Sequence, residues 1–189
     1  MNPFNRLIVH YCNKGDIFKT YKHPLYDNDG TSIVEYLKYL AAKTTEGMHG
    51  KLDLYAYYGF LAEISFKFDM FARGHQFLHP GHYENGADLG DFVRYKNQKR
   101  YVFDVKSSYL YRNISILPRQ DIDIDAYIGI YIQPHVWGEY DDPENMEGID
   151  LCVYGWITPK NLHRYDLGYC PHSILIAPER FTPCSALAK

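Results

Sequence analysis

Apolar side chains recur at helical spacing in the middle of the chain. Between residues 52 and 71 they occupy positions 54, 57, 58, 61, 64, 68 and 71. A repeat near 3.6 residues is typical of a helix that buries one face, and Gly74 is well placed to end it. The pattern therefore predicts a helix over Leu52–Phe71. A shorter helix is expected over about 32–43, where Thr31 or Ser32 can cap its N-terminus.

Beyond residue 74 the apolar pattern changes to the period of two that strands show. Phe92–Tyr95 and Arg100–Ser108 flank a polar Lys96–Lys99 turn, which together predict a β-hairpin. Further elements are expected as strands over 7–11, 126–133, 149–156 and 173–177, and as a short helix with Pro159 at its first position. This order of elements predicts an α/β (α+β) fold, with a central mixed β-sheet flanked by helices.

Length and composition suit a single domain spanning residues 1–189. Of the 189 residues, 46% are hydrophobic, which is enough for one core. No apolar run is long enough to span a bilayer, and the first residues lack the basic-then-apolar order of a signal peptide. We therefore expect a cytoplasmic protein that does not enter a membrane. A bacterial, phage or viral context is compatible with this.

The charge balance limits how the chain could bind nucleic acid. Its formal charge is −3, whereas proteins that rely on non-specific phosphate contacts usually carry a strong positive excess. Any such contact must therefore come from a local patch. Basic residues gather at the predicted hairpin and just after it: Arg94, Lys96, Lys99, Arg100, Arg112 and Arg119. They could hold phosphates, or they could simply keep an exposed edge strand from pairing with another chain.

The cysteines allow two interpretations. There are four of them, with no Cys-x-x-Cys pair: Cys12, Cys152, Cys170 and Cys184. Without an export signal they are most simply reduced thiols. The alternative is a zinc site in which the segments His10–Cys12 and Cys170–His172 each supply two ligands.

The sequence Asp104-Val105-Lys106 places opposite charges on one face of a predicted strand. Residues i and i+2 of a strand project to the same side, so the Asp104 carboxylate and the Lys106 ammonium group are expected side by side, with Val105 facing the core. An ordinary surface ion pair would show the same pattern. What distinguishes this one is a second acid on the other arm of the hairpin, either Asp88 or Asp91.

The length of the hairpin turn decides which acid lies nearest. A two-residue turn at Asn97–Gln98 puts Asp91 directly across from Asp104, whereas a longer or bulged loop brings Asp88 closer. Like charges at this distance raise each other's pKa, and a divalent cation removes the conflict. Mg²⁺ takes oxygen ligands from one or two carboxylates and keeps water and phosphate oxygens in its other positions.

Glu63 is a further acid, placed among apolar residues of the predicted helix. A carboxylate in such surroundings is costly unless it is solvated, paired or bound to a cation. Glu63 can add a metal contact, although a glutamate on a wet helix flank is the ordinary alternative. Lys106 can orient or deprotonate an attacking water, or neutralise developing charge. These are the groups that metal-assisted phosphodiester hydrolysis needs.

Helical Glu63, then Asp88, then Asp104-Val105-Lys106 resembles the PD-(D/E)XK nuclease superfamily, which includes many restriction endonucleases and junction resolvases. The motifs of the resemblance lie in residues 52–108, and it extends more weakly to 126–132 and 155–158. It implies a restriction-endonuclease-like core. In this family the first Asp precedes the Asp-x-Lys element by about the 16 positions that separate Asp88 from Asp104, which favours Asp88 over Asp91.

The resemblance implies a Mg²⁺-dependent deoxyribonuclease, with Mn²⁺ as a substitute ion, that hydrolyses phosphodiester bonds in DNA. No Gln-x-x-x-Tyr pair follows the Asp-x-Lys element, which favours endonucleolytic over exonucleolytic action. By the same resemblance Asp88, Asp104 and Glu63 bind the metal, with Asp91 as the alternative to Asp88. Lys106 then serves the attacking water. Such hydrolases often act as dimers, so a homodimer is compatible with this assignment.

Two other classes of protein fit the same residues. One is a catalytically inactive nucleic-acid- or protein-binding module on the same fold. The other is an unrelated small-molecule enzyme or a structural viral protein, in which the 19 tyrosines are simply core residues. Convergence of the acids and Lys106 in space is what the nuclease hypothesis requires.

Overall fold

The computed structural model of the chain describes residues 10–11, 54–72, 75, 90–109, 112–118, 122–134, 149–168 and 173–183. The helical elements are α2 (Leu54–Ala72), α3 (Pro159–Tyr165) and the 3-10 turn η4 (Pro178–Arg180). The strands are β1 (His10–Tyr11), β2 (Phe92–Lys96), β3 (Lys99–Ser108), β4 (Ile114–Ile116), β5 (Ala126–Pro134), β6 (Ile149–Ile157) and β7 (Ile174–Ile176).

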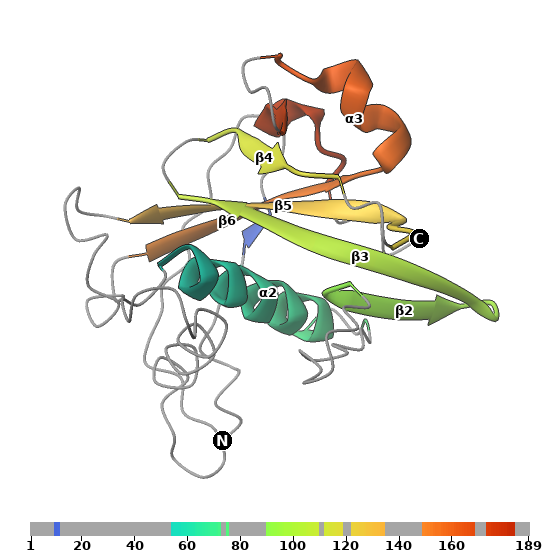
Figure 1. Ribbon diagram of the computed structural model, residues 1–189. Coiled ribbons are helices and arrows are strands. Elements are labelled where there is room, and N and C mark those ends of the chain that lie inside the picture. Colours follow the sequence, from blue (N-terminus) through green and yellow to red (C-terminus); the bar gives the residue numbers. More distant parts are fainter. Residues whose placement is uncertain are drawn as a thin grey trace, which may run out of the picture.

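A mixed five-stranded sheet with the order β1-β6-β5-β3-β2 lies at the centre of the structure (Figure 1). β2 pairs with β3, and β5 with β6, in antiparallel fashion. β3 and β5 run parallel, as do β6 and β1. The expected α/β class with a central mixed sheet is therefore confirmed.

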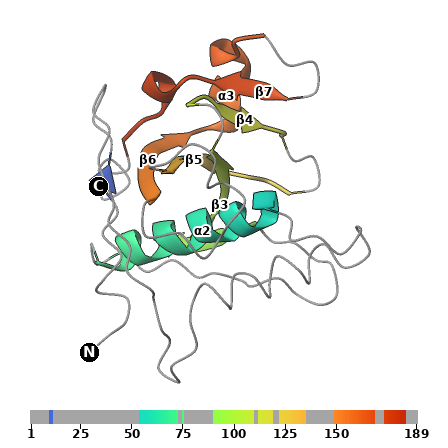
Figure 2. The ribbon, with the colours of Figure 1, turned by 90° about the vertical axis from the view of Figure 1, so that its left-hand side faces the viewer.

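Two layers cover the sheet. Helix α2 packs on one face, while the small β4–β7 sheet and α3 lie on the other (Figure 2). Successive residues of β3 divide between the two sides, as a strand requires. Phe103 and Val105 join the apolar core beneath α2, and Val102 joins the core beneath β4, β7 and α3. Val105 thus faces the core as predicted, and both faces of β3 are covered.

The β2–β3 hairpin closes through a two-residue turn. Its central residues Asn97–Gln98 have φ angles of 52° and 63°, and two positive values are typical of the tight type I′ turn. The register begins at Phe92, which pairs with Phe103, so Asp91 lies just outside the paired residues. The predicted hairpin and its short turn are confirmed, and this geometry determines the arrangement of the site.

Most of the other expected elements agree with the structure. The helix predicted over 52–71 forms as α2, the later strands form as β5, β6 and β7, and Pro159 begins α3. β4 was not predicted, because three residues are too few to show a period. The helix expected over 32–43 lies outside the described residues. Neither α2 nor α3 combines the length and the apolar character of a membrane-spanning helix.

Gly155 allows the end of the described chain to lie against β6. Its φ is +129°, and a Cβ at this position would overlap the carbonyl oxygen of Thr182. The neighbouring Trp156 exchanges two backbone hydrogen bonds with Thr182, each 2.8 Å long. Only glycine combines this φ with so close an approach, so residue 155 is fixed by backbone packing.

Cys152 corrects the expectation of four reduced thiols. It is buried in β6 and disulfide-bonded. Its partner is outside the described residues, where Cys12, Cys170 and Cys184 all lie. None of the four side chains of the zinc alternative is among those that the structure describes.

Candidate functional site

Asp104 and Lys106 form an ion pair on one face of β3. The Lys106 Nζ to Asp104 Oδ2 distance is 2.6 Å, as the i, i+2 spacing predicts. Asp104 is buried, with 1% of its surface exposed, while 27% of the Lys106 side chain is exposed. Apart from this ion pair, Asp104 Oδ2 receives no hydrogen bond from the part of the chain that the structure describes. A buried carboxylate oxygen with a single partner retains capacity for a further cation or donor.

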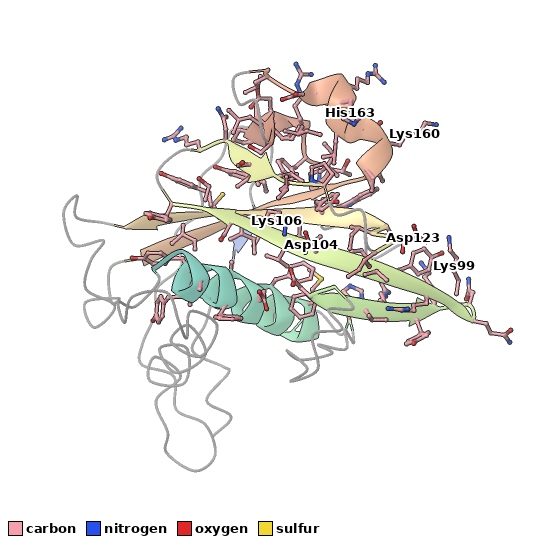
Figure 3. The ribbon with its side chains drawn as sticks, in the orientation of Figure 1. Lys99, Asp104, Lys106, Asp123, Lys160 and His163 are labelled. Atoms are coloured by element: carbon pink, nitrogen blue, oxygen red, sulfur yellow. The ribbon has the colours of Figure 1, made fainter. Side chains whose placement is uncertain are left out.

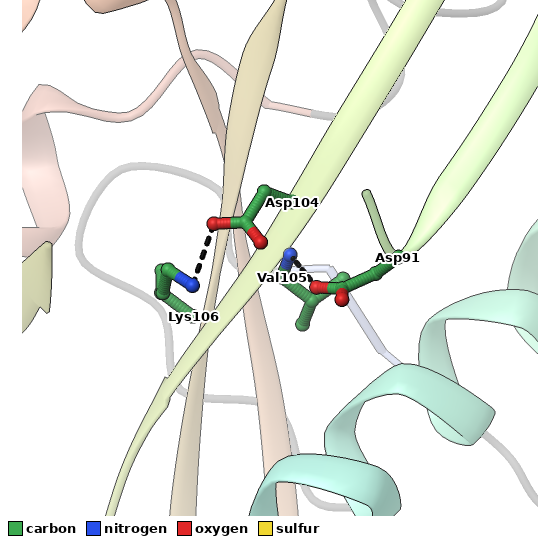
Figure 4. A network of polar contacts seen from close by, with 4 residues as sticks. All are labelled: Asp91, Asp104, Val105 and Lys106. Atoms are coloured by element: carbon green, nitrogen blue, oxygen red, sulfur yellow. Dashed lines mark hydrogen bonds and ion pairs between the residues drawn. The ribbon is translucent and has the colours of Figure 1, made fainter. Parts of the chain in front are cut away.

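Asp91 lies just before β2, and its side chain reaches the backbone of Val105, the neighbour of Asp104 on β3 (Figure 4). Its backbone N–H donates to the Phe103 carbonyl at 3.1 Å. Its side chain replaces the backbone acceptor that a neighbouring strand would provide, because Oδ2 accepts the Val105 N–H at 2.6 Å. The carboxylate of Asp91 is therefore held at the edge of β3, between Asp104 and the helical layer.

Electrostatic repulsion links Asp91 to both of the other acids. Burial, followed by the charges of Glu63 and Asp104, raises the pKa of Asp91 from 3.8 to about 8. The Val105 N–H and the Lys106 ammonium group act in the opposite direction but do not cancel this rise. Glu63, in α2, is itself only 8% exposed. Asp91 thus interacts with two further carboxyl groups and one ammonium group, and the four groups carry an excess of negative charge when all are ionised.

The donor set fits a hard divalent cation. No three His, Cys, Asp or Glu side chains within the described ranges are gathered as a ready-made metal site. Asp91 is turned to Val105 and Asp104 to Lys106, so both would have to reorient to share an ion. Mg²⁺ requires only one or two carboxylates, because it keeps several waters. Asp91 and Asp104 provide these two carboxylates, and Glu63 supplies further negative charge from α2.

The structure brings together four of the five residues that the sequence singled out: Glu63, Asp91, Asp104 and Lys106. Asp88 lies outside the described residues, so its assignment stays a prediction. The two-residue turn forms, and Asp91 hydrogen-bonds to Phe103 and Val105, the two neighbours of Asp104 on β3. Sequence reasoning missed the role of the Val105 N–H, since a backbone donor leaves no trace in the side-chain pattern.

The basic residues expected to hold phosphates divide into two groups. Arg94, Lys96, Lys99 and Arg100 lie along the β2–β3 hairpin, with Lys99 and Arg100 exposed. Arg112 is exposed in the segment between β3 and β4, and its charge acts on Tyr154 of β6. Arg119 is outside the described residues. The hairpin is therefore the basic feature that is continuous with the Asp104–Lys106 strand.

Comparisons of the chain with protein-family models, with curated proteins and with solved structures find no match. The functional assignment therefore depends on the residues and the geometry of the site.

Proposed function

We propose that this protein is a Mg²⁺-dependent nuclease that hydrolyses phosphodiester bonds within DNA, on a restriction-endonuclease-like core. The observation that carries the proposal is the position of Asp91, whose carboxyl group interacts with Asp104, Glu63 and Lys106, beside the Asp104–Lys106 ion pair. A buried group of like charges is unfavourable, and structural ion pairs do not require three acids at one place. A site that receives a divalent cation accounts for all four residues.

Asp91 and Asp104 are the proposed metal ligands, with Glu63 as the third acid. When bound there, Mg²⁺ polarises the phosphate and lowers the pKa of a coordinated water. Lys106 is partly exposed and already close to Asp104, so its ammonium group can donate to the attacking water or to a phosphate oxygen. The Val105 N–H holds the Asp91 carboxylate at β3, and Asp91 would have to leave this donor to bind a metal ion.

Cleavage assays test this proposal directly. Supercoiled plasmid, linear duplex and single-stranded DNA are incubated with and without Mg²⁺. Wild type should cut only with the metal, and Asp104→Asn or Lys106→Ala should lower the rate by about 10²–10⁴-fold. Asp123→Asn is the matched control, since Asp123 is an exposed aspartate outside the site. Full activity of Asp104→Asn would refute the assignment.

The choice of the first metal ligand needs a separate pair of variants. Asp91→Asn and Asp88→Asn remove the same charge three positions apart. If Asp91 is the ligand, its variant should lose Mg²⁺ binding in calorimetry while Asp88→Asn retains it. The reverse result would restore the assignment that the family spacing favours.

A further inference from the structure

The turn end of the β2–β3 hairpin projects beyond the rest of the sheet. β5 pairs with β3 only from Phe103 onward. At the preceding residue, Val102, the backbone is hydrogen-bonded to Asp125 instead: its carbonyl accepts the Asp125 N–H, and its N–H donates to the Asp125 carboxylate. Residues 94–101 therefore continue as a ribbon of two strands, with no third strand of the described chain beside it. Figure 1 shows this end of the hairpin reaching past β5 and β6.

The projecting ribbon is strongly basic, unlike the rest of the chain. Between Phe92 and Phe103 it holds four cationic residues and no acid, whereas the whole chain carries a charge of −3. Lys96 lies directly across from Lys99. Like charges in such a cross-strand pair are destabilising unless an anion lies between them. The ribbon is thus complementary to a polyanion.

The cations lie on both faces of the ribbon, because the register and the alternation of strands put Arg94, Lys96 and Lys99 on one face and Arg100 on the other. Lys99 and Arg100 are both exposed, and as neighbours on one strand they project to opposite sides. The exposed Tyr95 lies across from Arg100, and Lys99 sits over the Tyr101 ring at 4.7 Å. A ribbon lying flat on one phosphate backbone would need charge on one face only. Charge on both faces suits a position between two backbones.

We propose that this hairpin is a duplex-binding arm that enters the major groove of the DNA cut by the site. The inference rests on the proposed function, because it assumes DNA as the substrate. The major groove is wide enough for a two-stranded ribbon. Arg100 and Lys99 are four and five positions from Asp104 along β3, which is about 14–17 Å at strand spacing. At about 3.4 Å per base pair, the arm contacts the duplex about 4–5 base pairs from the cleaved bond.

Binding is measured in the Asp104→Asn background, so that cleavage does not interfere. The probe is a labelled duplex of about 30 base pairs, beside one of its single strands, over a range of salt concentrations. The arm variant is Lys99→Gln with Arg100→Gln. The matched control, Lys160→Gln with Arg164→Gln, removes the same charge from exposed positions on α3, well away from Lys99 (Figure 3).

The arm variant should bind the duplex at least about 10-fold more weakly. The slope of log K against the logarithm of the salt concentration should become less steep by about 2. Lys99→Arg should retain affinity, and the control pair should change little. Hydroxyl-radical footprints of the arm variant should lose protection about 4–5 base pairs from the position of the cut. Circular dichroism verifies that each variant is folded.

Equal losses in the arm and control variants, or equal losses for duplex and single strand, would overturn the proposal. Its failure is separable from failure of the proposed function. Duplex binding that depends on the arm, without Mg²⁺-dependent cleavage, would refute the nuclease proposal and support the arm. Mg²⁺-dependent cleavage by wild type, with normal duplex binding by the arm variant, would refute the arm and support the nuclease proposal.

Discussion

Replacing Asp91 by asparagine should make the metal-free protein more stable and inactive at once. The side-chain oxygen of the new amide can still accept the Val105 N–H, so the link at the edge of β3 survives. What disappears is a buried carboxyl group that its surroundings, Glu63 and Asp104 among them, keep from ionising at neutral pH. The gain should depend on pH, because the wild-type carboxyl group titrates and the amide does not.

The size of the effect follows from the pKa of Asp91, which rises from 3.8 to about 8 on folding. A carboxyl group with a raised pKa binds more protons in the folded than in the unfolded chain, so wild-type stability falls as pH rises between about 4 and 8. One unit of pKa corresponds to about 1.4 kcal/mol. From pH 5 to pH 7 the advantage of Asp91→Asn in free energy of unfolding should therefore grow by about 2.7 kcal/mol, or about 5–10 °C in Tm.

Urea unfolding in the presence of a chelator, at pH 5, 6 and 7, measures this difference. Asp123→Asn controls for the loss of one carboxylate at an exposed position. Added Mg²⁺ should then stabilise wild type more than Asp91→Asn, because only the wild type offers the carboxylate to the ion. If the wild-type and Asp91→Asn curves run parallel from pH 5 to pH 7, the account of repulsion among the three acids is wrong.

Three further substitutions test individual features. Lys106→Ala should lower stability by about 3 kcal/mol, because it leaves the buried Asp104 charge without its cation, and adding Asp104→Asn should restore stability but not cleavage. Gly155→Ala should cost about 3 kcal/mol or more in thermal unfolding, since its Cβ has no room, whereas Gly59→Ala in α2 meets nothing and should stabilise by about 0.5–1 kcal/mol. Gln98→Gly should stabilise by about 1 kcal/mol, because glycine adopts the positive φ of this position without strain; an unchanged Tm would contradict the strained turn.

Local patterns made much of the fold predictable. The 3.6-residue repeat located α2, and two alternating runs around a polar turn located the β2–β3 hairpin. The i, i+2 rule for strands was enough to pair Asp104 with Lys106. These features depend on residues close in sequence, and such contacts are what a single sequence encodes most directly.

Contacts between distant segments were harder to predict. β4 pairs with β7, and β1 pairs with β6. No local pattern in the sequence indicates which distant strand each of these pairs with. The disulfide of Cys152 has the same origin, because spacing alone does not reveal which cysteines meet. For the first acid, family spacing favoured Asp88 while turn geometry favoured Asp91. Only the structure shows that Asp91 hydrogen-bonds to the two neighbours of Asp104 on β3.

The hydrogen bond from Val105 N–H to Asp91 gives the site a natural reporter. That amide proton is shielded from exchange only while the aspartate faces the strand. Capture of an ion would draw the aspartate away and leave the amide to solvent, so occupancy of the site becomes readable in an NMR spectrum at one backbone resonance. Under the proposed function, binding of the ion would therefore also remove one hydrogen bond from β3.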